Sequence, residues 1–370
     1  MKKCTKGSEY MKILVVNPIM YTSETRKVQK RKSLVDTMAI GLCTTFKLMN
    51  NDVVLYTCDE YKPSEDEKYP FDVVFDKAKY KKIFPVNKFI KLKGLKKYLK
   101  NHNFDLIICS ECFQMTTFDC VKSRKKGIVI WQELAAHNRM MKTIPSRIWY
   151  SFVVRFLFRK ITIVARSENA KKFISKYSKN VSEITIGHGV YTEFFQPSTK
   201  DDQFIVSSQL IKRKRVDKIL EAFSDFIKND NFNHYKLIIC GDGPERKNLE
   251  NMTVTLNIEK NVEFLGKLPH SELIKVLSRS KAMLIKTIQD NNMISITESL
   301  ACGTPVITTS VPYNSYFIKK NVCGIVRDDW NYEDLIKICE SDLYIKNCLS
   351  YRDYYDYSYK VRQFLSLIKQ

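Results

Sequence analysis

The chain has 370 residues, of which 44% are hydrophobic and 28% are charged, as in ordinary globular proteins. No uncharged apolar run approaches the roughly 18 residues that cross a bilayer, so we do not expect an integral membrane protein. The polar first ten residues fit neither a secretory signal nor a transit peptide, and the eleven cysteines are expected to stay reduced in the cytoplasm. The length exceeds one ordinary core and predicts two α/β domains.

The net charge of +22 is unevenly distributed along the chain. Residues 1–198 hold 37 Lys and Arg against 18 Asp and Glu, whereas the remainder holds 25 against 22. A basic domain attracts phosphate, either on nucleic acid or on anionic lipid headgroups. Because no nucleic-acid-binding motif accompanies the charge, we expect an anionic membrane surface as the partner and no specific nucleic acid.

Short apolar runs rich in β-branched residues alternate with amphipathic helical patterns, which predicts parallel sheets built from βαβ units. The first series comprises residues 13–16, 53–56, 106–109, 128–131, 161–165 and 184–186. After the polar stretch 196–203 a second series follows at 204–207, 236–240, 262–265, 282–285 and 305–308. We therefore predict one doubly wound domain over 1–198 and another over 199–352. A helical segment at 353–370 would cap the second domain or cross back to the first.

Two basic stretches of the first half alternate with apolar residues. Residues 81–100 hold eight Lys and no acid, and Arg147, Ser151, Arg155 and Arg159 recur every four residues in an apolar run. The second pattern fits either a core helix with a solvated edge or a helix lying on a membrane interface. We favour membrane contact, because the helix pattern agrees with the charge asymmetry.

The cysteine pattern gives no metal site. Cys109 and Cys112 form a CxxC pair with Cys120 nearby, but no second CxxC pair and no nearby His completes a ligand set. The sequence therefore predicts no bound metal.

Residues 290–307 form the most informative segment, which reads as a loop, a helix, a stop and a strand. The free N–H groups and the positive dipole end of such a helix suit a diphosphate. Asp290 and Glu298 are eight residues apart, or about 12 Å along a helix. One carboxylate could reach the hydroxyls of a sugar and the other those of a ribose, although two acids at this spacing are also common by chance.

This segment resembles a known family. The run ESLACGTPVI at 298–307, with an acid eight residues before it, resembles the EX7E signature of glycosyltransferase family 4, which are retaining enzymes of GT-B fold. Three further segments match in the family's order: IGHGVYTEFFQP at 186–197, VDKILEAF at 216–223, and GDGPE at 241–245 followed by NVEFLG at 261–266. The resemblance is strong over residues 184–310 and holds only in outline before them.

The resemblance implies two Rossmann-like domains that face each other across a cleft. Residues 1–198 would bind the acceptor and residues 199–352 a nucleotide-sugar donor, with UDP favoured over GDP. The implied activity is metal-independent transfer of a hexose, without a further cofactor, to a lipid-linked or glycan acceptor in cell-surface polysaccharide or glycolipid biosynthesis. The implied location is peripheral, on the inner face of the cytoplasmic membrane.

The resemblance also implies roles for individual residues. Glu298 would bind the donor ribose, Asp290 the transferred sugar and Lys214 the diphosphate. Other donor-binding candidates lie beside these in the sequence: Gln209, Arg213, Gly241, Asn291, Asn292, Met293 and Ile294, the last four through backbone N–H groups. Either His137 or Glu133 would face the donor sugar from the first domain, and His188 at the hinge is expected to be structural.

Four departures from the family pattern keep a second hypothesis open. Asp290 stands where the family has Glu, Asn291-Asn292-Met293 replaces Gly-Phe-Gly, Gln209 replaces an arginine, and the glycine-rich loop after the first strand is missing. The alternative is a non-catalytic GT-B subunit that scaffolds a partner transferase. A nicotinamide enzyme is disfavoured, because Arg246 stands where a dinucleotide fingerprint needs its third glycine.

Overall fold

The computed structural model describes residues 10–21, 30–79, 89–136 and 138–368, and the chain divides into two units. Unit 1 comprises Met1–Gly189 and Tyr357–Gln370, and unit 2 comprises Val190–Asp356. The boundaries expected at 198 and 353 are thus replaced by boundaries at 189 and 357. The shift has a physical cause, since Val190 pairs with Asp356 and the Arg352 guanidinium donates to the Phe195 carbonyl.

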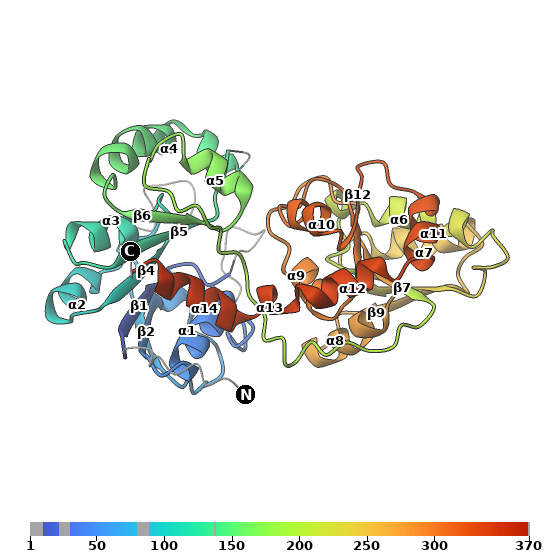
Figure 1. Cartoon of the computed structure of the whole chain (residues 1–370), viewed down its shortest axis with the longest axis horizontal. Helices are drawn as coiled ribbons and strands as arrows, with labels where there is room; N and C mark the ends of the chain where they lie inside the picture. Colours follow the sequence, from blue (N-terminus) through green and yellow to red (C-terminus); the bar gives the residue numbers. More distant parts are fainter. Residues whose placement is uncertain (1–9, 22–29, 80–88, 137, 369–370) are drawn as a thin grey trace. The chain divides into compact units, whose positions relative to one another are not determined.

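Unit 1 is built on a sheet of six parallel strands in the order β3-β2-β1-β4-β5-β6 (Figure 1). The strands are β1 (Lys12–Val16), β2 (Asp52–Cys58), β3 (Asp72–Asp76), β4 (Leu106–Ser110), β5 (Ile128–Gln132) and β6 (Thr162–Ala165). The four central strands β2, β1, β4 and β5 consist almost entirely of buried residues. Such continuous apolar runs are typical of parallel strands that are covered on both faces.

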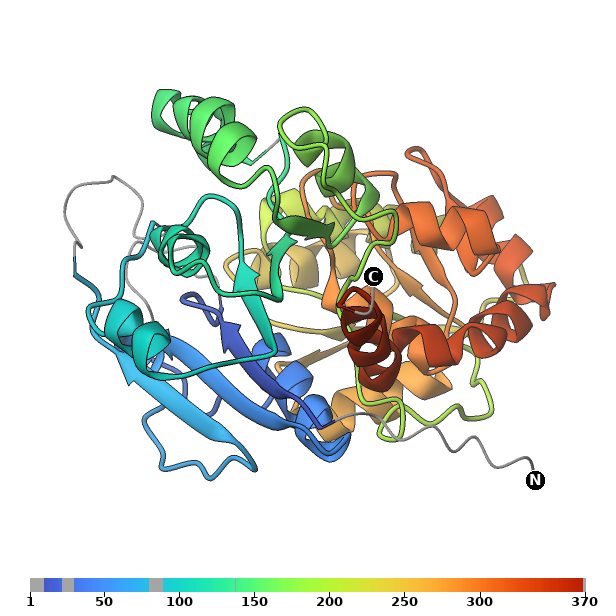
Figure 2. The same ribbon diagram turned by 60° about the vertical axis from the view of Figure 1, so that its left-hand side comes forward.

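Helices cover both faces of this sheet, including one from the end of the chain. They are α1 (Met38–Leu48), η1 (Asp59–Tyr61), α2 (Leu95–Asn101), α3 (Met115–Lys122), η2 (Arg139–Lys142), α4 (Ile144–Ile148), η3 (Trp149–Leu157), α5 (Glu168–Ile174) and α14 (Tyr357–Ser366). In α14 the Phe364 ring lies 6.3 Å from that of Phe46 and 5.3 Å from that of Trp131. Of the two positions considered for the last segment, the chain takes the one against unit 1, where α14 lies beside α1 (Figures 1 and 2).

Unit 2 repeats the architecture with the strand order β12-β11-β10-β7-β8-β9, again all parallel. Its strands are β7 (Gln203–Ser207), β8 (Lys236–Cys240), β9 (Val262–Gly266), β10 (Ala282–Leu284), β11 (Val306–Thr308) and β12 (Gly324–Val326). Its helices are η4 (Lys212–Lys214), α6 (Val216–Phe226), α7 (Arg246–Thr255), α8 (His270–Arg279), α9 (Ile294–Ala301), α10 (Ser315–Asn321), α11 (Tyr332–Cys339), α12 (Leu343–Ser350) and α13 (Arg352–Tyr355). One buried cluster, which includes Phe204, Phe223 and Trp330, fills the space between the sheet of unit 2 and the helices α6 and α11.

Some sequence expectations fail at the sheet edges. Residues 184–186 do not form a strand, because the Ile186 carbonyl accepts the Trp131 indole N–H instead of continuing a ladder. The edge strands β3 and β12 were not predicted. Half-exposed residues make up most of β3, and β12 has only three residues. Of the basic stretch 81–100, residues 81–88 lie outside the described part of the chain.

Each sheet has one place where the strand order reverses. In unit 2 the chain runs from β7 through β8 to β9 on one side, and from β10 to β12 on the other. In unit 1 the same reversal occurs between β1 and β4. In doubly wound sheets ligands bind beyond the carboxyl ends of the strands at this point. The loops after β7 and β10, and those after β1 and β4, are therefore the places to look for a site.

Candidate functional site

The reversal point of unit 2 holds an acid between two basic side chains. Lys214, at the end of η4 after β7, places Nζ 2.5 Å from Asp290 Oδ2, and Asp290 lies in the loop after β10. Arg213 Nη1 lies 3.1 Å from the same oxygen. The Lys214 residue is only 9% exposed, which makes this a largely buried ion pair. Two fixed positive charges thus meet where the fold predicts a ligand.

Backbone contacts hold the two loops together. The Ile288 N–H and the Thr287 hydroxyl both donate to the Arg213 carbonyl. Arg215 then adopts a left-handed conformation, with φ of 52°, as the cap before α6. The turn directs Arg213 and Lys214 toward the β10 loop, so the sequence KRKR at 212–215 forms a defined site and not a solvated basic patch.

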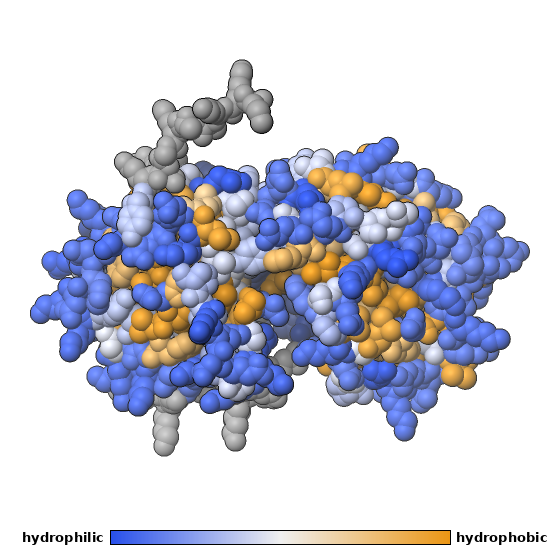
Figure 3. Space-filling model, turned by 90° about the horizontal axis from the view of Figure 1, so that it is seen from below, coloured by the Kyte–Doolittle hydropathy of each residue, from blue (hydrophilic) through white to orange (hydrophobic). Residues whose placement is uncertain are grey.

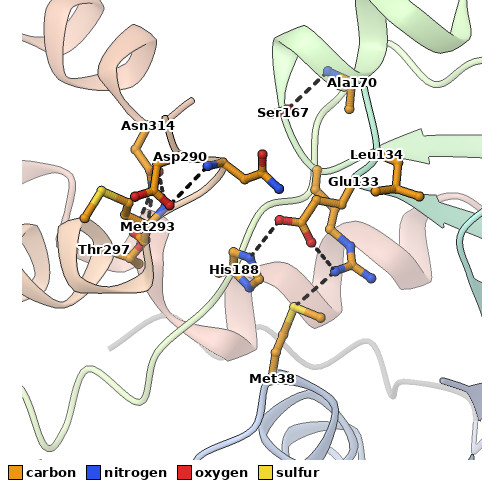
Figure 4. Close-up of polar contacts among 12 residues, drawn as sticks. Met38, Glu133, Leu134, Ser167, Ala170, His188, Asp290, Met293, Thr297 and Asn314 are labelled. Carbon is orange, nitrogen blue, oxygen red and sulfur yellow. Dashed lines mark hydrogen bonds and ion pairs between the residues drawn. The ribbon is translucent and has the colours of Figure 1, made fainter. Parts of the chain in front are cut away.

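The start of α9 differs from the expectation for residues 291–294. The Met293 N–H donates to Asn314 Oδ1 at 2.8 Å, and Asn314 Nδ2 lies 3.4 Å from the Thr297 hydroxyl oxygen (Figure 4). The Met293 N–H is therefore not offered to a ligand, contrary to the sequence prediction. Asn291 and Asn292 are half-buried beside Asp290, and Ile294 is 41% exposed at the first residue of α9.

Glu298 lies on α9, one face of which is buried in unit 2. Its Oε1 atom lies 2.9 Å from Nε2 of His270, the first residue of α8, and its side chain is 13% exposed. The His270 ring in turn contacts that of Phe195 at 5.6 Å. The imidazole fixes the orientation of the carboxylate. Sequence reasoning missed His270, whose only signal was its place just after the NVEFLG segment.

Two further predicted donor residues have different surroundings. Gln209 follows β7 with an exposed side chain. Gly241 follows β8 with φ of +143°, and a Cβ atom there would lie 1.8 Å from the Ser208 carbonyl oxygen. The glycine is therefore required for the close approach of the loops after β7 and β8.

Unit 1 contains a second polar cluster, around Glu133 after β5. Arg166 Nη1 lies 2.9 Å from Glu133 Oε2, and His188 Nε2 lies 3.8 Å from Oε1 (Figure 4). Burial alone would raise the pKa of Glu133, but His188 and the Arg166 guanidinium outweigh it and lower that pKa to about 2. The Arg166 guanidinium also lies 4.0 Å over the Trp131 ring. Glu133 is thus a fixed anion, whereas His137, its predicted alternative, lies outside the described residues.

Glu111 completes this cluster and was not predicted. It follows β4 at the reversal point, with φ of 67°, and accepts the backbone N–H groups of Glu133 and Leu134. Burial raises the pKa of Glu111 to about 7, although Arg166 opposes the shift. A carboxyl group that titrates near neutral pH in such a place is a candidate for proton handling. Its signal in the sequence was the position directly after an apolar strand.

The described residues provide no metal site and no membrane span. No group of three or more His, Cys, Asp or Glu among them could hold a metal ion. Cys109, Cys112 and Cys120 are buried free thiols. Across the described ranges, no helix has both the length and the apolar character to cross a bilayer.

Comparisons with known proteins agree with this architecture. Residues 192–359 match the family model described as glycosyl transferases group 1. The alpha-monoglucosyldiacylglycerol synthase of Streptococcus pneumoniae is 25% identical over 49% of this chain and 44% of its own length. The N-acetyl-alpha-D-glucosaminyl L-malate synthase of Bacillus anthracis is 33% identical over 28% of this chain and 26% of its own length. The chain thus spans less than half of each of these relatives.

Fold similarity extends over both units. HepE from Anabaena, solved in complex with UDP, superposes with a TM-score of 0.70 over 97% of this chain and 100% of that chain, at 13% identity. At this identity the likeness concerns the fold alone. The family match covers unit 2, where the ordered motifs and the Lys214–Asp290 pair lie. The chain therefore has the two-unit GT-B fold, and its residues 192–359 match the glycosyl transferases group 1 family.

Proposed function

We propose that the protein is a retaining glycosyltransferase that moves a hexose from a nucleotide-sugar to a lipid-linked or membrane-proximal acceptor. A UDP-sugar is favoured as the donor over a GDP-sugar. The observation that carries this proposal is the placement of Lys214 and Arg213 at the reversal point of the unit 2 sheet. Two cations at this place suit a diphosphate. HepE, which shares the fold, was solved with UDP.

Asp290 and a donor diphosphate would compete for the same two cations. The Asp290 carboxylate pairs with the largely buried Lys214 and with Arg213, and so offsets their positive charge. A nucleotide diphosphate would bring its own negative charge, so Asp290 could turn to the hydroxyls of the transferred sugar. Glu298, held by His270, would accept hydrogen bonds from the ribose hydroxyls.

A transfer that retains the configuration of the sugar at its anomeric carbon requires no nucleophile from the protein. The acceptor hydroxyl attacks on the face that the nucleotide leaves, and the departing phosphate takes its proton. The work of the protein is to stabilise the charge that develops on the leaving diphosphate. Lys214 and Arg213 would supply this stabilisation from fixed positions, because the ion pairs and the loop contacts hold them.

The acceptor is proposed from the first unit and from a relative. Residues 1–198 carry the basic excess, which would hold the enzyme on an anionic membrane. The pneumococcal relative is named for the synthesis of a glucosyldiacylglycerol, which is a glycolipid. We therefore place the protein in cell-surface polysaccharide or glycolipid biosynthesis, peripheral on the inner face of the cytoplasmic membrane.

One observation favours the alternative of a non-catalytic scaffold subunit. The Met293 N–H is already bonded to Asn314, and Asp290 is already paired, so the donor groups of unit 2 satisfy one another. Such a site could persist in a protein that no longer binds a donor. Hydrolysis or transfer of a donor by the purified protein would exclude this alternative.

A thermal-shift screen against UDP- and GDP-sugars tests the proposal directly. A ligand at 100 times its dissociation constant should add about 2.7 kcal/mol to the free energy of unfolding. We expect a UDP-sugar to raise the melting temperature of the wild type and not that of Lys214→Ala. Lys218→Ala is the matched control, since Lys218 is a half-buried lysine of α6 that pairs with Glu221 in its own helix. Absence of a shift with every nucleotide sugar would contradict donor binding.

A further inference from the structure

We infer that α4 and η3 dock unit 1 onto an anionic bilayer through an exposed apolar stripe. The docking stripe consists of Ile144, Ile148, Phe152 and Phe156. The inference rests on the proposed function only in that the acceptor would then lie in the same membrane.

The two sides of this helical segment are both apolar, but only one is buried. Tyr150, Val154 and Phe158 are at most 1% exposed and pack into unit 1. The docking stripe lies on the other side, where its four side chains are 71%, 56%, 63% and 58% exposed in chain order. The buried side explains the helix as part of the core. It leaves the second apolar side without a structural explanation, and contiguous exposed apolar surface marks an interaction site.

The backbone conformation keeps the stripe in line. Trp149–Leu157 is a π-helix, and the Phe158 N–H donates to the Val153 carbonyl five residues back. Residues four apart lie on nearly the same side of a helix, so the stripe continues from α4 through η3. The Phe152 and Phe156 rings indeed lie 6.3 Å apart. The π-helix is rare, and its commonest form, the single-turn bulge, is frequent at functional sites.

The basic residues around the docking stripe indicate that its partner is an anionic bilayer. No Asp or Glu occurs between Glu133 and Glu168, whereas Lys142, Arg147, Arg159 and Lys160 in this stretch are all exposed. Apolar side chains flanked by basic ones are what an anionic interface binds, with the apolar groups inserted and the cations at the headgroups. Arg155 has a different role, because its guanidinium donates to the Lys176 carbonyl and fastens η3 to the end of α5.

The position of the segment within unit 1 leaves it accessible. In Figure 2 the green helix of residues 144–157 projects from the edge of the unit. Figure 3 shows the side of unit 1 away from α4, where hydrophilic side chains dominate and smaller hydrophobic areas lie between them. In α1, which lies on that side, Lys47 and Leu48 are both exposed and serve as a matched control pair of one cation and one apolar residue.

Vesicle co-sedimentation of the full chain tests the inference. We expect wild type to bind phosphatidylglycerol-containing vesicles more strongly than pure phosphatidylcholine vesicles. Arg147→Gln with Arg159→Gln should lower the partition coefficient by roughly 25-fold, since each basic residue near an anionic surface is worth about fivefold. Phe152→Ser with Phe156→Ser should lower it by at least about tenfold and remove the part of the binding that survives high salt. Lys47→Gln with Leu48→Ser should change it by less than about fivefold.

A fluorescence probe follows insertion itself. Phe152→Trp should show a blue-shifted emission, quenched by brominated lipid, on anionic vesicles, whereas Leu48→Trp should not. If the Lys47/Leu48 control variant lost as much binding as the stripe variants, general basicity would explain the binding. If the emission of Phe152→Trp were not quenched, the stripe would be an interface for a protein partner. Either result would overturn the inference. The stripe variants should retain the thermal shift with a UDP-sugar. Donor binding without vesicle binding refutes the docking surface alone, and vesicle binding without donor binding refutes the proposed function alone.

Discussion

Lys214 Nζ and Asp290 Oδ2 lie 2.5 Å apart, and they join the loop after β7 to the loop after β10 across the reversal point of the sheet. Neither residue is near the other in sequence. Arg213 adds a second contact to the same carboxylate oxygen. This pairing keeps the cations positioned before a donor arrives, so little reorganisation should be needed when a diphosphate replaces the carboxylate.

Removal of Lys214 or of the Glu298 charge should abolish or greatly weaken donor use. Lys214→Ala and Glu298→Gln each remove a charge-assisted contact worth about 1.5–3 kcal/mol, or roughly 10- to 150-fold in donor kcat/KM. Donor-dependent turnover and far-UV circular dichroism would be measured together. We expect both variants to remain folded, with Lys218→Ala as the active control. Wild-type turnover in either variant would overturn its assignment to the donor site.

His270 should matter for donor binding through Glu298. His270→Ala removes the contact that orients the Glu298 carboxylate, so we expect a higher donor KM, by about tenfold, with a smaller change in kcat. Phe195 also packs on the ring, so a fall in stability must be checked by thermal melting. His270→Gln, which can still donate a hydrogen bond, should restore part of the lost affinity. An unchanged KM in His270→Ala would show that Glu298 needs no support.

Glu111 should make stability depend on pH near neutrality. Its pKa is about 7 in the folded chain against 4.5 for an ordinary glutamate, so the folded state keeps a proton that the unfolded state loses. Its contribution to the free energy of unfolding is therefore largest below pH 4.5 and declines as the pH rises to 7. Glu111→Gln should lack this decline and gain on the order of 2 kcal/mol relative to wild type between pH 5 and 8.

Urea midpoints of both proteins at pH 5 and pH 8 would measure the Glu111 effect. Glu133 does not confuse the comparison, because its pKa of about 2 makes its contribution vary only below pH 4.5. If the midpoints of wild type and Glu111→Gln shift in parallel, the Glu111 carboxyl does not titrate in this range.

Local sequence patterns predicted the central strands and α9 well, because buried parallel strands and a helix with a glycine stop have strong local signals. Contacts made across the fold could not be predicted. Nothing in the sequence near Met293 shows that Asn314 takes its N–H, and nothing near Glu298 shows that His270 pairs with it. The cluster of Glu111, Glu133 and Arg166 similarly depends on three neighbouring strands ending at one edge. The basic stripe at 147–159 was recognised, but its partner, the exposed apolar stripe, needed the structure.

Turnover should survive an excess of EDTA. Lys214 and Arg213 already supply positive charge at the proposed diphosphate site, and the described residues offer no ligand cluster for a divalent ion. Activity with and without chelator, followed by addition of Mg²⁺ or Mn²⁺, would check this expectation. If chelation stopped turnover and a divalent ion restored it, the proposal that Lys214 and Arg213 supply the positive charge at the diphosphate site would be contradicted.

We expect Gly241 to be required for the stability of unit 2, and not primarily for contact with a ligand. A Cβ atom at this position would lie 1.8 Å from the Ser208 carbonyl oxygen, and φ of +143° is strained for any other residue. The neighbouring backbone cannot yield easily, because the Gly241 N–H donates to Gly266 at 2.7 Å and the Ser208 N–H donates to Cys240 at 3.1 Å. Gly241→Ala should therefore cost about 3 kcal/mol or more in the free energy of unfolding.

Lys247→Ala, an exposed substitution in the adjoining α7, should change the free energy of unfolding by less than about 0.5 kcal/mol. A Gly241→Ala protein with the wild-type melting temperature but no thermal shift with a UDP-sugar would show instead that the position acts on the donor itself.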